Sequence, residues 1–376
     1  MEDFAVIIGL QNYPALDDPL NGQAPISGAE TDAKNFEEWA VSQEGGAVPL
    51  TNVIRILSSD YTNPANNLAN TQPTEIEITA AFDRLRGFSK SNREAGRGSR
   101  VGRRLYIFMS GHGVAPKPFG ERIVKESALL MANVDPDNIS ALRYHIPGNY
   151  TASWFCENEC FDEVFLFMDC CRDTLTVSST NAFLPNTGNS DKAVRFFAFA
   201  TKWSRRAKEK IIDGKMQGIF TRTLLLGLRG AGADPDPENP GFGVITGASL
   251  KSFLYGNIEG LVEPQFRNDA DTNEPDIEYA PKAREGRNII IKKGVPLQRF
   301  PVIVSVAAGA SGKISILNGD FKEVAAAQIN NPPVEIPFNL PRAVYLANCN
   351  RDGATVNARL EVTGLEKAGK ELIVNL

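Results

Sequence analysis

The chain has 376 residues, of which 42% are hydrophobic, and its formal net charge is -5 at pH 7. Because this length exceeds the roughly 100–200 residues of one ordinary domain, we expect one large domain and one small one. The mild negative charge and the odd number of cysteines argue against a nucleic-acid-binding protein and against a secreted, disulfide-bonded scaffold.

The beginning of the chain has no basic leader. Its first apolar run, Phe4–Leu10, breaks at Gln11 and is too short for a signal peptide or a membrane span. We therefore expect a cytoplasmic protein that contacts neither membrane nor nucleic acid.

Short apolar runs alternate with helical stretches through the first three quarters of the chain. Two helices begin at capping-box signals, Ser27 with Glu30 and Thr74 with Glu77. This alternation predicts an α/β fold with a doubly wound, mostly parallel sheet. The runs with the composition of buried strands are Phe4–Leu10, Val53–Leu57, Leu105–Met109, Val164–Met168 and Phe196–Ala200.

The later segments predict where the large domain ends. We expect helices over Phe220–Leu228 and Ser249–Tyr255, a turn-rich segment between them, and a last strand at Asn288–Ile291. The large domain would cover residues 1–294, and a small all-β sandwich would cover residues 297–376. The strand-sized segments of this second domain are Val302–Val306, Lys313–Leu317, Val334–Phe338, Val344–Ala347, Val356–Val362 and Glu371–Val374.

Two of the predicted strands run into residues that can carry out covalent catalysis. One is followed by Ser110, Gly111, His112 and Gly113, and the other by Asp169, Cys170 and Cys171. In open α/β sheets, chemistry collects beyond the carboxyl ends of the strands. If the two strands are neighbours, the imidazole and the thiol meet at one rim.

A thiol and an imidazole in contact form a complete acyl-transfer pair. The thiolate is the nucleophile, and the imidazole of His112 stabilises it and later protonates the leaving amine. The backbone N–H groups of Gly113 and Cys171 are candidates for an oxyanion hole. This chemistry needs neither a metal nor a cofactor.

The order strand-Ser-Gly-His-Gly, followed about sixty residues later by strand-Asp-x-Cys, resembles the caspase and metacaspase superfamily of cysteine peptidases. It is most similar to the bacterial metacaspase-like, or orthocaspase, branch. The resemblance implies a caspase-like fold over residues 4–292 and a regulated thiol protease that cleaves proteins or peptides in signalling, cell death or defence. Supporting segments are Ala5–Tyr13, Gly28–Ala33, Gly218–Thr221 and Glu263–Gln265.

The resemblance also implies a specificity. It places Asp32 and Asp169 in the pocket for the residue before the cleaved bond, where two carboxylates would bind an Arg or Lys side chain. The animal caspase signature Gln-Ala-Cys is missing, which argues against cleavage after Asp. Trp203 follows a predicted strand and is expected to wall a neighbouring subsite.

The sequence departs from the metacaspase pattern in two places. The usual His-Ser-Gly after the nucleophile is replaced by Arg172-Asp173-Thr174, which leaves the substrate side near Arg172 undefined. Some metacaspases are activated by calcium through a cluster of loop carboxylates, and we match no such cluster here.

Several residues have a structural interpretation beside the functional one. Free cysteines are usually buried, and the Asp-x-Cys spacing makes Cys171 the nucleophile and Cys170 the core residue. Asp32 could simply interact with a helix dipole. The residues His145, Cys156, Cys160 and Cys170 have tolerable spacing for zinc but lack a second tight pair.

The whole chain also has an alternative interpretation. A caspase-like pseudo-enzyme or adaptor would keep the fold, bind a regulatory protein through its β-domain and use no dyad. The retention of both His112 and Cys171 favours the enzyme.

Overall fold

The computed structural model divides by its contacts into two compact units, which are described separately. The first is Met1–Leu225 with Leu261–Ile289, and the second is Leu226–Gly260 with Ile290–Leu376. The boundary near residue 294 stays a prediction. The residues described are 2–16, 26–62, 68, 71–117, 126–135, 137, 145–179, 193–202, 207–239, 241–261, 274–280, 289–319, 321–362 and 372–375.

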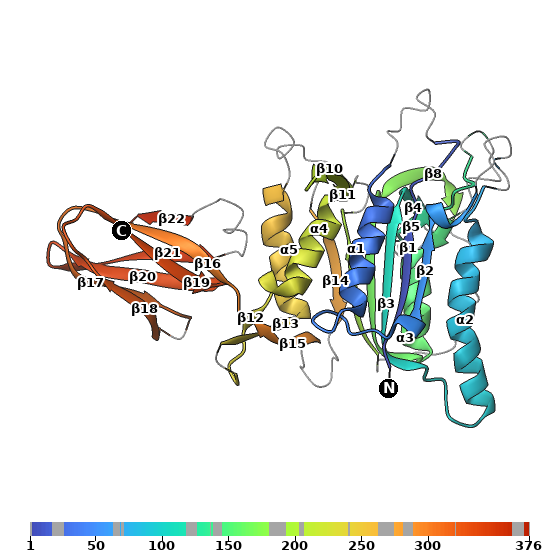
Figure 1. Ribbon diagram of the computed structural model, residues 1–376, viewed down its shortest axis with the longest axis horizontal. Helices are drawn as coiled ribbons and strands as arrows, with labels where there is room; N and C mark the ends of the chain where they lie inside the picture. Colours follow the sequence, from blue (N-terminus) through green and yellow to red (C-terminus); the bar gives the residue numbers. More distant parts are fainter. Residues whose placement is uncertain are drawn as a thin grey trace. The chain divides into compact units, whose positions relative to one another are not determined.

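The first unit is built on a six-stranded sheet with the order β14-β9-β7-β3-β1-β2 (Figure 1). Its first five strands in the chain are parallel, and β14 is antiparallel to β9. The five parallel strands are those that the sequence predicts, whereas β14 is not predicted. The bounds are β1 Phe4–Gly9, β2 Val53–Leu57, β3 Gly102–Gly111, β7 Phe161–Cys170, β9 Val194–Phe199 and β14 Asp276–Ala280.

Helices pack on both faces of this sheet. On one face, Phe36 of α1 stacks on Phe108 of β3, with ring centroids 4.6 Å apart. On the other, the alternate side chains of β3 share a buried core with Phe82 of α2 and Phe155 of α3. Because side chains of a strand alternate between faces, a strand covered on both sides is apolar throughout. The helices are α1 Ala29–Val41, α2 Glu75–Glu94, α3 Gly148–Glu157 and α4 Ile219–Leu226, and the 3₁₀ turns are Leu50–Asn52 and Ser58–Asp60.

The fold class predicted from the sequence, an α/β fold with a doubly wound, mostly parallel sheet followed by an all-β region, is confirmed by this architecture. The start of α2 is also confirmed, since Thr74 and Glu77 form the capping box. The box predicted at Ser27 and Glu30 is wrong. Helix α1 begins at Ala29 after Gly28 and has no side-chain cap from its own N-cap residue.

Two small β structures lie beyond the carboxyl ends of β3 and β7 (Figure 1). One is a four-stranded sheet with the order β6-β5-β4-β8, and the other is the hairpin β10-β11. Neither is predicted, because their strands are short and their pairing depends on distant parts of the chain. The bounds are β4 Gly113–Lys117, β5 Ala128–Leu130, β6 His145–Pro147, β8 Asp173–Ser179, β10 Glu209–Ile212 and β11 Lys215–Gly218.

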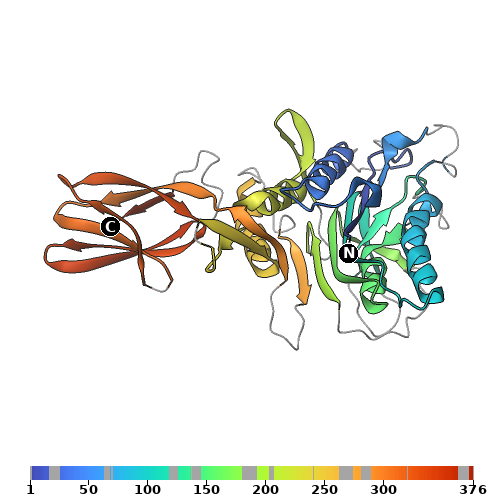
Figure 2. The same ribbon diagram turned by 60° about the horizontal axis from the view of Figure 1, so that its bottom comes forward.

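The second unit contains a β-sandwich. One sheet has the order β19-β16-β22 and the other β18-β17-β20-β21, and their inner faces share one buried core. Figure 2 shows these strands in orange and red. The bounds are β16 Arg299–Val306, β17 Ala310–Leu317, β18 Glu323–Gln328, β19 Val334–Pro341, β20 Ala343–Arg351, β21 Ala354–Val362 and β22 Leu372–Asn375.

The segment before the sandwich belongs to the same unit. Phe253 of α5 and Ala231 lie in the sandwich core. Arg342 donates hydrogen bonds to the carbonyl of Gly232 and to Asp234. The helix predicted at Ser249–Tyr255 is therefore present, but it is longer than predicted, and it packs with the C-terminal strands. The elements are the π-helical turn Gly227–Ala231, β12 Asp234–Pro235, β13 Phe242–Thr246, α5 Gly247–Leu261 and β15 Ile290–Pro296.

In the part of the chain that the structure describes, no helix has both the length and the apolar character that crossing a membrane requires.

Candidate active site

The register of the paired strands brings His112 and Cys171 to the same level. Gly111 of β3 pairs with Cys170 of β7, and beyond the sheet Val114 of β4 pairs with Asp173 of β8. The two partners are separated by the same number of residues in both pairs, so neither segment has an extra residue between the first pair and the second. His112 and Cys171 therefore lie opposite one another where the two strands leave the central sheet.

The two adjacent cysteines differ in their surroundings. Cys170 is buried in the core on the α2 and α3 face, and burial raises the pKa of its thiol far above the usual range. Cys171 is half-buried, and its Sγ lies 4.0 Å from the carbonyl oxygen of Ala207. Adjacent strand residues point to opposite faces, so only one of the two thiols faces the core.

Gly113 allows the chain to pass close to this pair. A methyl group on Gly113 would lie 2.6 Å from Cys170 Sγ and 2.7 Å from the carbonyl oxygen of Cys171. Any other residue would push the His112 turn away from the cysteines. The glycine predicted as an oxyanion donor is thus adjacent to the predicted nucleophile.

The backbone of His112 is held by Tyr13, which follows β1. The His112 N–H donates to the Tyr13 hydroxyl at 3.1 Å, and this hydroxyl lies 3.2 Å from the carbonyl of Leu130, to which it donates. The two rings meet edge to face with centroids 4.9 Å apart. Gly111 has φ +154°, and a methyl group there would lie 2.5 Å from the Tyr13 hydroxyl. No pattern in the sequence indicates that Tyr13 belongs to the site.

Burial lowers the pKa of His112 to about 4. Its Nε2 is buried and has no hydrogen-bond partner among the described residues. A neutral imidazole with an open nitrogen can accept a proton from a thiol. The residue is therefore in the protonation state that a general base requires at neutral pH.

Asp32 and Asp169 converge on one glycine. The N–H of Gly218, at the end of β11, donates to Asp32 at 2.9 Å, and Thr221 donates its N–H and hydroxyl to Asp169 at 3.0 and 2.7 Å. A methyl group on Gly218 would overlap the Asp169 carboxylate and lie 2.8 Å from Asp32 Oδ2. The structure therefore brings together the two acids that the sequence analysis assigns to one pocket.

The surroundings of both carboxylates disfavour their charged forms. Burial and the nearby Asp169 raise the pKa of Asp32 well above its usual range. Burial raises the pKa of Asp169 to about 6, and the hydrogen bonds from Thr221 oppose this rise. The Oδ1 atom of Asp32 is buried without a hydrogen-bond partner among the described residues. Such a pair is best satisfied by a cationic group.

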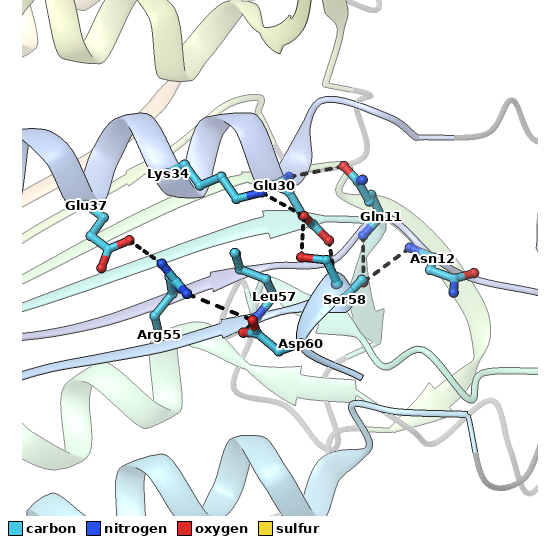
Figure 3. Close-up of polar contacts among 10 residues, drawn as sticks. Gln11, Asn12, Glu30, Lys34, Glu37, Arg55, Leu57, Ser58 and Asp60 are labelled. Atoms are coloured by element: carbon cyan, nitrogen blue, oxygen red, sulfur yellow. Dashed lines mark hydrogen bonds and ion pairs between the residues drawn. The ribbon is translucent and has the colours of Figure 1, made fainter. Parts of the chain in front are cut away.

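A polar network holds the first turn of α1, and with it Asp32, against the ends of β1 and β2 (Figure 3). The Glu30 carboxylate accepts the N–H and the hydroxyl of Ser59 at 2.7 and 2.8 Å. Gln11 accepts the N–H of Glu30 at 3.4 Å and donates its own N–H to Ser58. Glu30 thus connects the helix to the loop after β2 instead of forming a capping box.

A third acid lies at the start of α1. The Glu209 carboxylate, on β10, accepts the N–H of Gly28 at 2.9 Å and that of Ser27 at 3.2 Å. Its charge raises the pKa of both Asp32 and Asp169. No local pattern in the sequence indicates this role, because Glu209 reaches the pocket only through the hairpin.

Arg172 is not on the substrate side. Its side chain is fully buried and donates to Asp276 at 2.7 Å and to the carbonyl of Thr201 at 3.1 Å. The guanidinium carbon lies 4.5 Å from the centroid of the Phe199 ring. The side chain of Arg172 therefore connects the end of β7 to β9 and β14 in the protein interior.

Two further predictions concern Trp203 and the binding of a metal ion. Trp203, expected in a subsite, lies outside the described residues. No group of three or more His, Cys, Asp or Glu side chains in the described ranges could hold a metal ion, so the zinc alternative has no ligand set there. Calcium activation stays untested.

The chain was compared with protein-family models, curated proteins and solved structures. No protein-family model matches the chain. A curated protein from a Desulfuromonadales bacterium, named "Probable protease", is 28% identical over 239 residues, covering 62% of this chain and 26% of that protein. The chain therefore spans about a quarter of the length of this relative.

Two solved structures also align with the chain. A protein from Geobacter sulfurreducens aligns with a TM-score of 0.43 and 13% identity, over 78% of this chain and 99% of that one. Caspase-1 from Spodoptera frugiperda aligns with a TM-score of 0.39 and 13% identity, over 78% of this chain and 92% of that one. The chain is an α/β protein that is similar in sequence to a protein named a probable protease.

Proposed function

We propose that the chain is a caspase-type cysteine endopeptidase with Cys171 as nucleophile and His112 as its acid-base partner. The observation that supports this most directly is the continuous strand register that sets the two residues opposite each other. The core position of Cys170 and the half-exposed position of Cys171 support the choice of nucleophile. The similarity to a probable protease supports a protein or peptide substrate.

The reaction proceeds in two acyl-transfer steps. The thiol proton of Cys171 passes to His112, and the thiolate attacks the scissile carbonyl carbon. The resulting oxyanion accepts hydrogen bonds from the backbone N–H groups of Gly113 and Cys171. His112 then protonates the leaving amine, the C–N bond breaks, and a thioester remains on Cys171. Water, deprotonated by His112, hydrolyses the thioester and restores the thiol.

The acidic pocket supports cleavage after a basic residue. Asp32 and Asp169 are buried next to Gly218 and lack a cationic partner among the described residues. An Arg or Lys side chain of the substrate would neutralise them through charge-assisted hydrogen bonds. A substrate Asp would add a third like charge and would be rejected.

The pH dependence of cleavage should report this pocket. The pKa of Asp169 is raised to about 6 and that of His112 is lowered to about 4. As the pH falls, Asp169 is therefore protonated before His112. We expect kcat/KM for an arginyl peptide to decline below about pH 6, in the direction of the Asp169 shift.

The control for this profile is the rate at which iodoacetamide alkylates Cys171, measured over the same pH range. Alkylation does not use the acidic pocket, so it should show no step near pH 6. An arginyl-peptide profile that stays flat down to pH 5 would contradict a role for Asp169 in binding.

Labelling by an active-site probe tests the proposal as a whole. A peptide with Arg at a thiol-reactive end should label the wild-type chain and should not label Cys171→Ala. A matched probe ending in Asp should label the wild type far more slowly. If neither probe labels Cys171 in the folded wild-type chain, the adaptor interpretation is favoured over the enzyme.

A further inference from the structure

The hairpin β10-β11 lies against the two acids assigned to the pocket, and Glu209 is one of the residues that join this hairpin to the start of α1. Both ribbon views place β10-β11 beside the start of α1 (Figures 1 and 2). Glu209 pairs with Gly218 across the hairpin, and Gly218 is the residue on which the two pocket acids converge. The attachment of Glu209 therefore bears directly on the shape of the pocket.

We infer that Glu209 is a positioning residue of the specificity pocket, whose carboxylate joins the hairpin β10-β11 to the N-terminus of α1. The part of this inference that concerns substrate binding rests on the proposed function. Its structural part stands on hydrogen bonds that are independent of any activity.

Glu209 binds the backbone at the entrance to α1, a helix without a side-chain cap from its own N-cap residue. Gly28 and Ser27 donate N–H groups to the two carboxylate oxygens at 2.9 and 3.2 Å. The N-cap residue Gly28 has no side chain that could do this. A carboxylate at this end also interacts favourably with the helix dipole. The helix start is therefore completed by a residue from far along the chain.

The fit at this junction is close. A methyl group on Gly28 would lie 2.7 Å from Glu209 Oε1 and 3.2 Å from the Cα atom of Gln217. The side chain of Gln217 in turn accepts a hydrogen bond from Asn35 of α1 at 3.4 Å. The hairpin thus touches α1 at two levels, and Asp32 lies between them in the chain.

The charge of Glu209 has a second consequence. The acids that it influences are Asp32 on α1 and Asp169 on β7, and its neighbours along the chain are Lys208 and Lys210. A third negative charge near the pair makes it harder for both to ionise. Neutralising Glu209 should therefore let the pocket keep its charge to lower pH.

Two substitutions separate the attachment from the charge. Glu209→Ala removes both, whereas Glu209→Gln keeps the shape and one acceptor oxygen but loses the charge. Glu44→Gln, at an exposed carboxylate in a turn of the same unit, is the matched control. Amide hydrogen exchange of the full chain reports the attachment, and the pH profile for an arginyl peptide reports the charge.

In Glu209→Ala we expect exchange of residues 209–218 and of Gly28 to accelerate by about tenfold, since charge-assisted hydrogen bonds to two amides are lost. KM for an arginyl peptide should rise more than kcat falls. In Glu209→Gln the acidic limb of kcat/KM should move to lower pH, which a merely structural role would not cause. Glu44→Gln should change neither.

Unchanged exchange in Glu209→Ala would overturn the inference, and so would an acidic limb that stays in place in Glu209→Gln. If the wild-type chain does not cleave arginyl peptides at all, the proposed specificity falls. In that case faster exchange in Glu209→Ala alone still supports the attachment, and unchanged exchange still overturns it.

Discussion

Replacing Cys171 by alanine is expected to lower kcat for peptide cleavage by about four orders of magnitude or more, because no other group can form the thioester. The fold should survive, since Cys171 is only half-buried and contributes little to the core. Cleavage of a fluorogenic arginyl peptide measures the loss, and thermal unfolding checks the fold.

Cys170→Ala is the matched control, because it removes the neighbouring thiol. Cys170 lies in the core of the first unit, so this variant should lose about 1–2 kcal/mol of stability and keep its activity. A fully active Cys171→Ala together with an inactive, folded Cys170→Ala would reverse the assignment of the nucleophile.

Asp32→Asn should lower kcat/KM for arginyl peptides by about a hundredfold or more, because one of the two charges facing the substrate cation is lost. The amide oxygen can still accept the N–H of Gly218, so the pocket should keep its shape. Alkylation of Cys171 by iodoacetamide should proceed at the wild-type rate. This contrast distinguishes damage to the pocket from damage to the dyad.

The same variant should be more stable than the wild type at neutral pH. Burial and Asp169 raise the pKa of Asp32 in the folded state. A carboxyl whose pKa is raised on folding costs stability in full above its folded pKa; the cost shrinks as the pH falls below that pKa and is gone below the unfolded pKa. Asp32→Asn removes the cost, so its Tm should exceed that of the wild type by about 2–4 °C at pH 7.

The stability difference should shrink on acidification, which thermal unfolding over a range of pH can follow. Unchanged cleavage after Arg in Asp32→Asn would contradict the acidic pocket without affecting the dyad. A Tm lower than that of the wild type at neutral pH would show that the Asp32 charge is compensated in the folded chain.

The elements that sequence reasoning predicts well are those whose cause is local. The five parallel strands are continuous apolar runs because they are covered on both faces. The capping box at Thr74 and Glu77 is confirmed because both partners lie within one turn. The same spacing at Ser27 and Glu30 misleads, because Glu30 instead accepts hydrogen bonds from Ser59.

By itself the sequence determined the chemistry that the chain can offer. His112 and Cys171 follow apolar runs, and parallel pairing of such runs places their ends at one rim. Asp32 and Asp169 are assigned to one pocket by the resemblance to metacaspases. These assignments depend on short motifs, which can be recognised without knowing which distant residues are in contact.

Only the tertiary structure decided how the pocket is closed. Glu209 binds the backbone N–H groups that precede α1, Tyr13 supports the His112 backbone, and Arg172 is buried against Asp276. Each contact joins residues on different elements, and no periodicity or spacing along the chain encodes such a pair. Strand pairing and helix packing bring them together, and the resulting burial raises the pKa of the pocket acids.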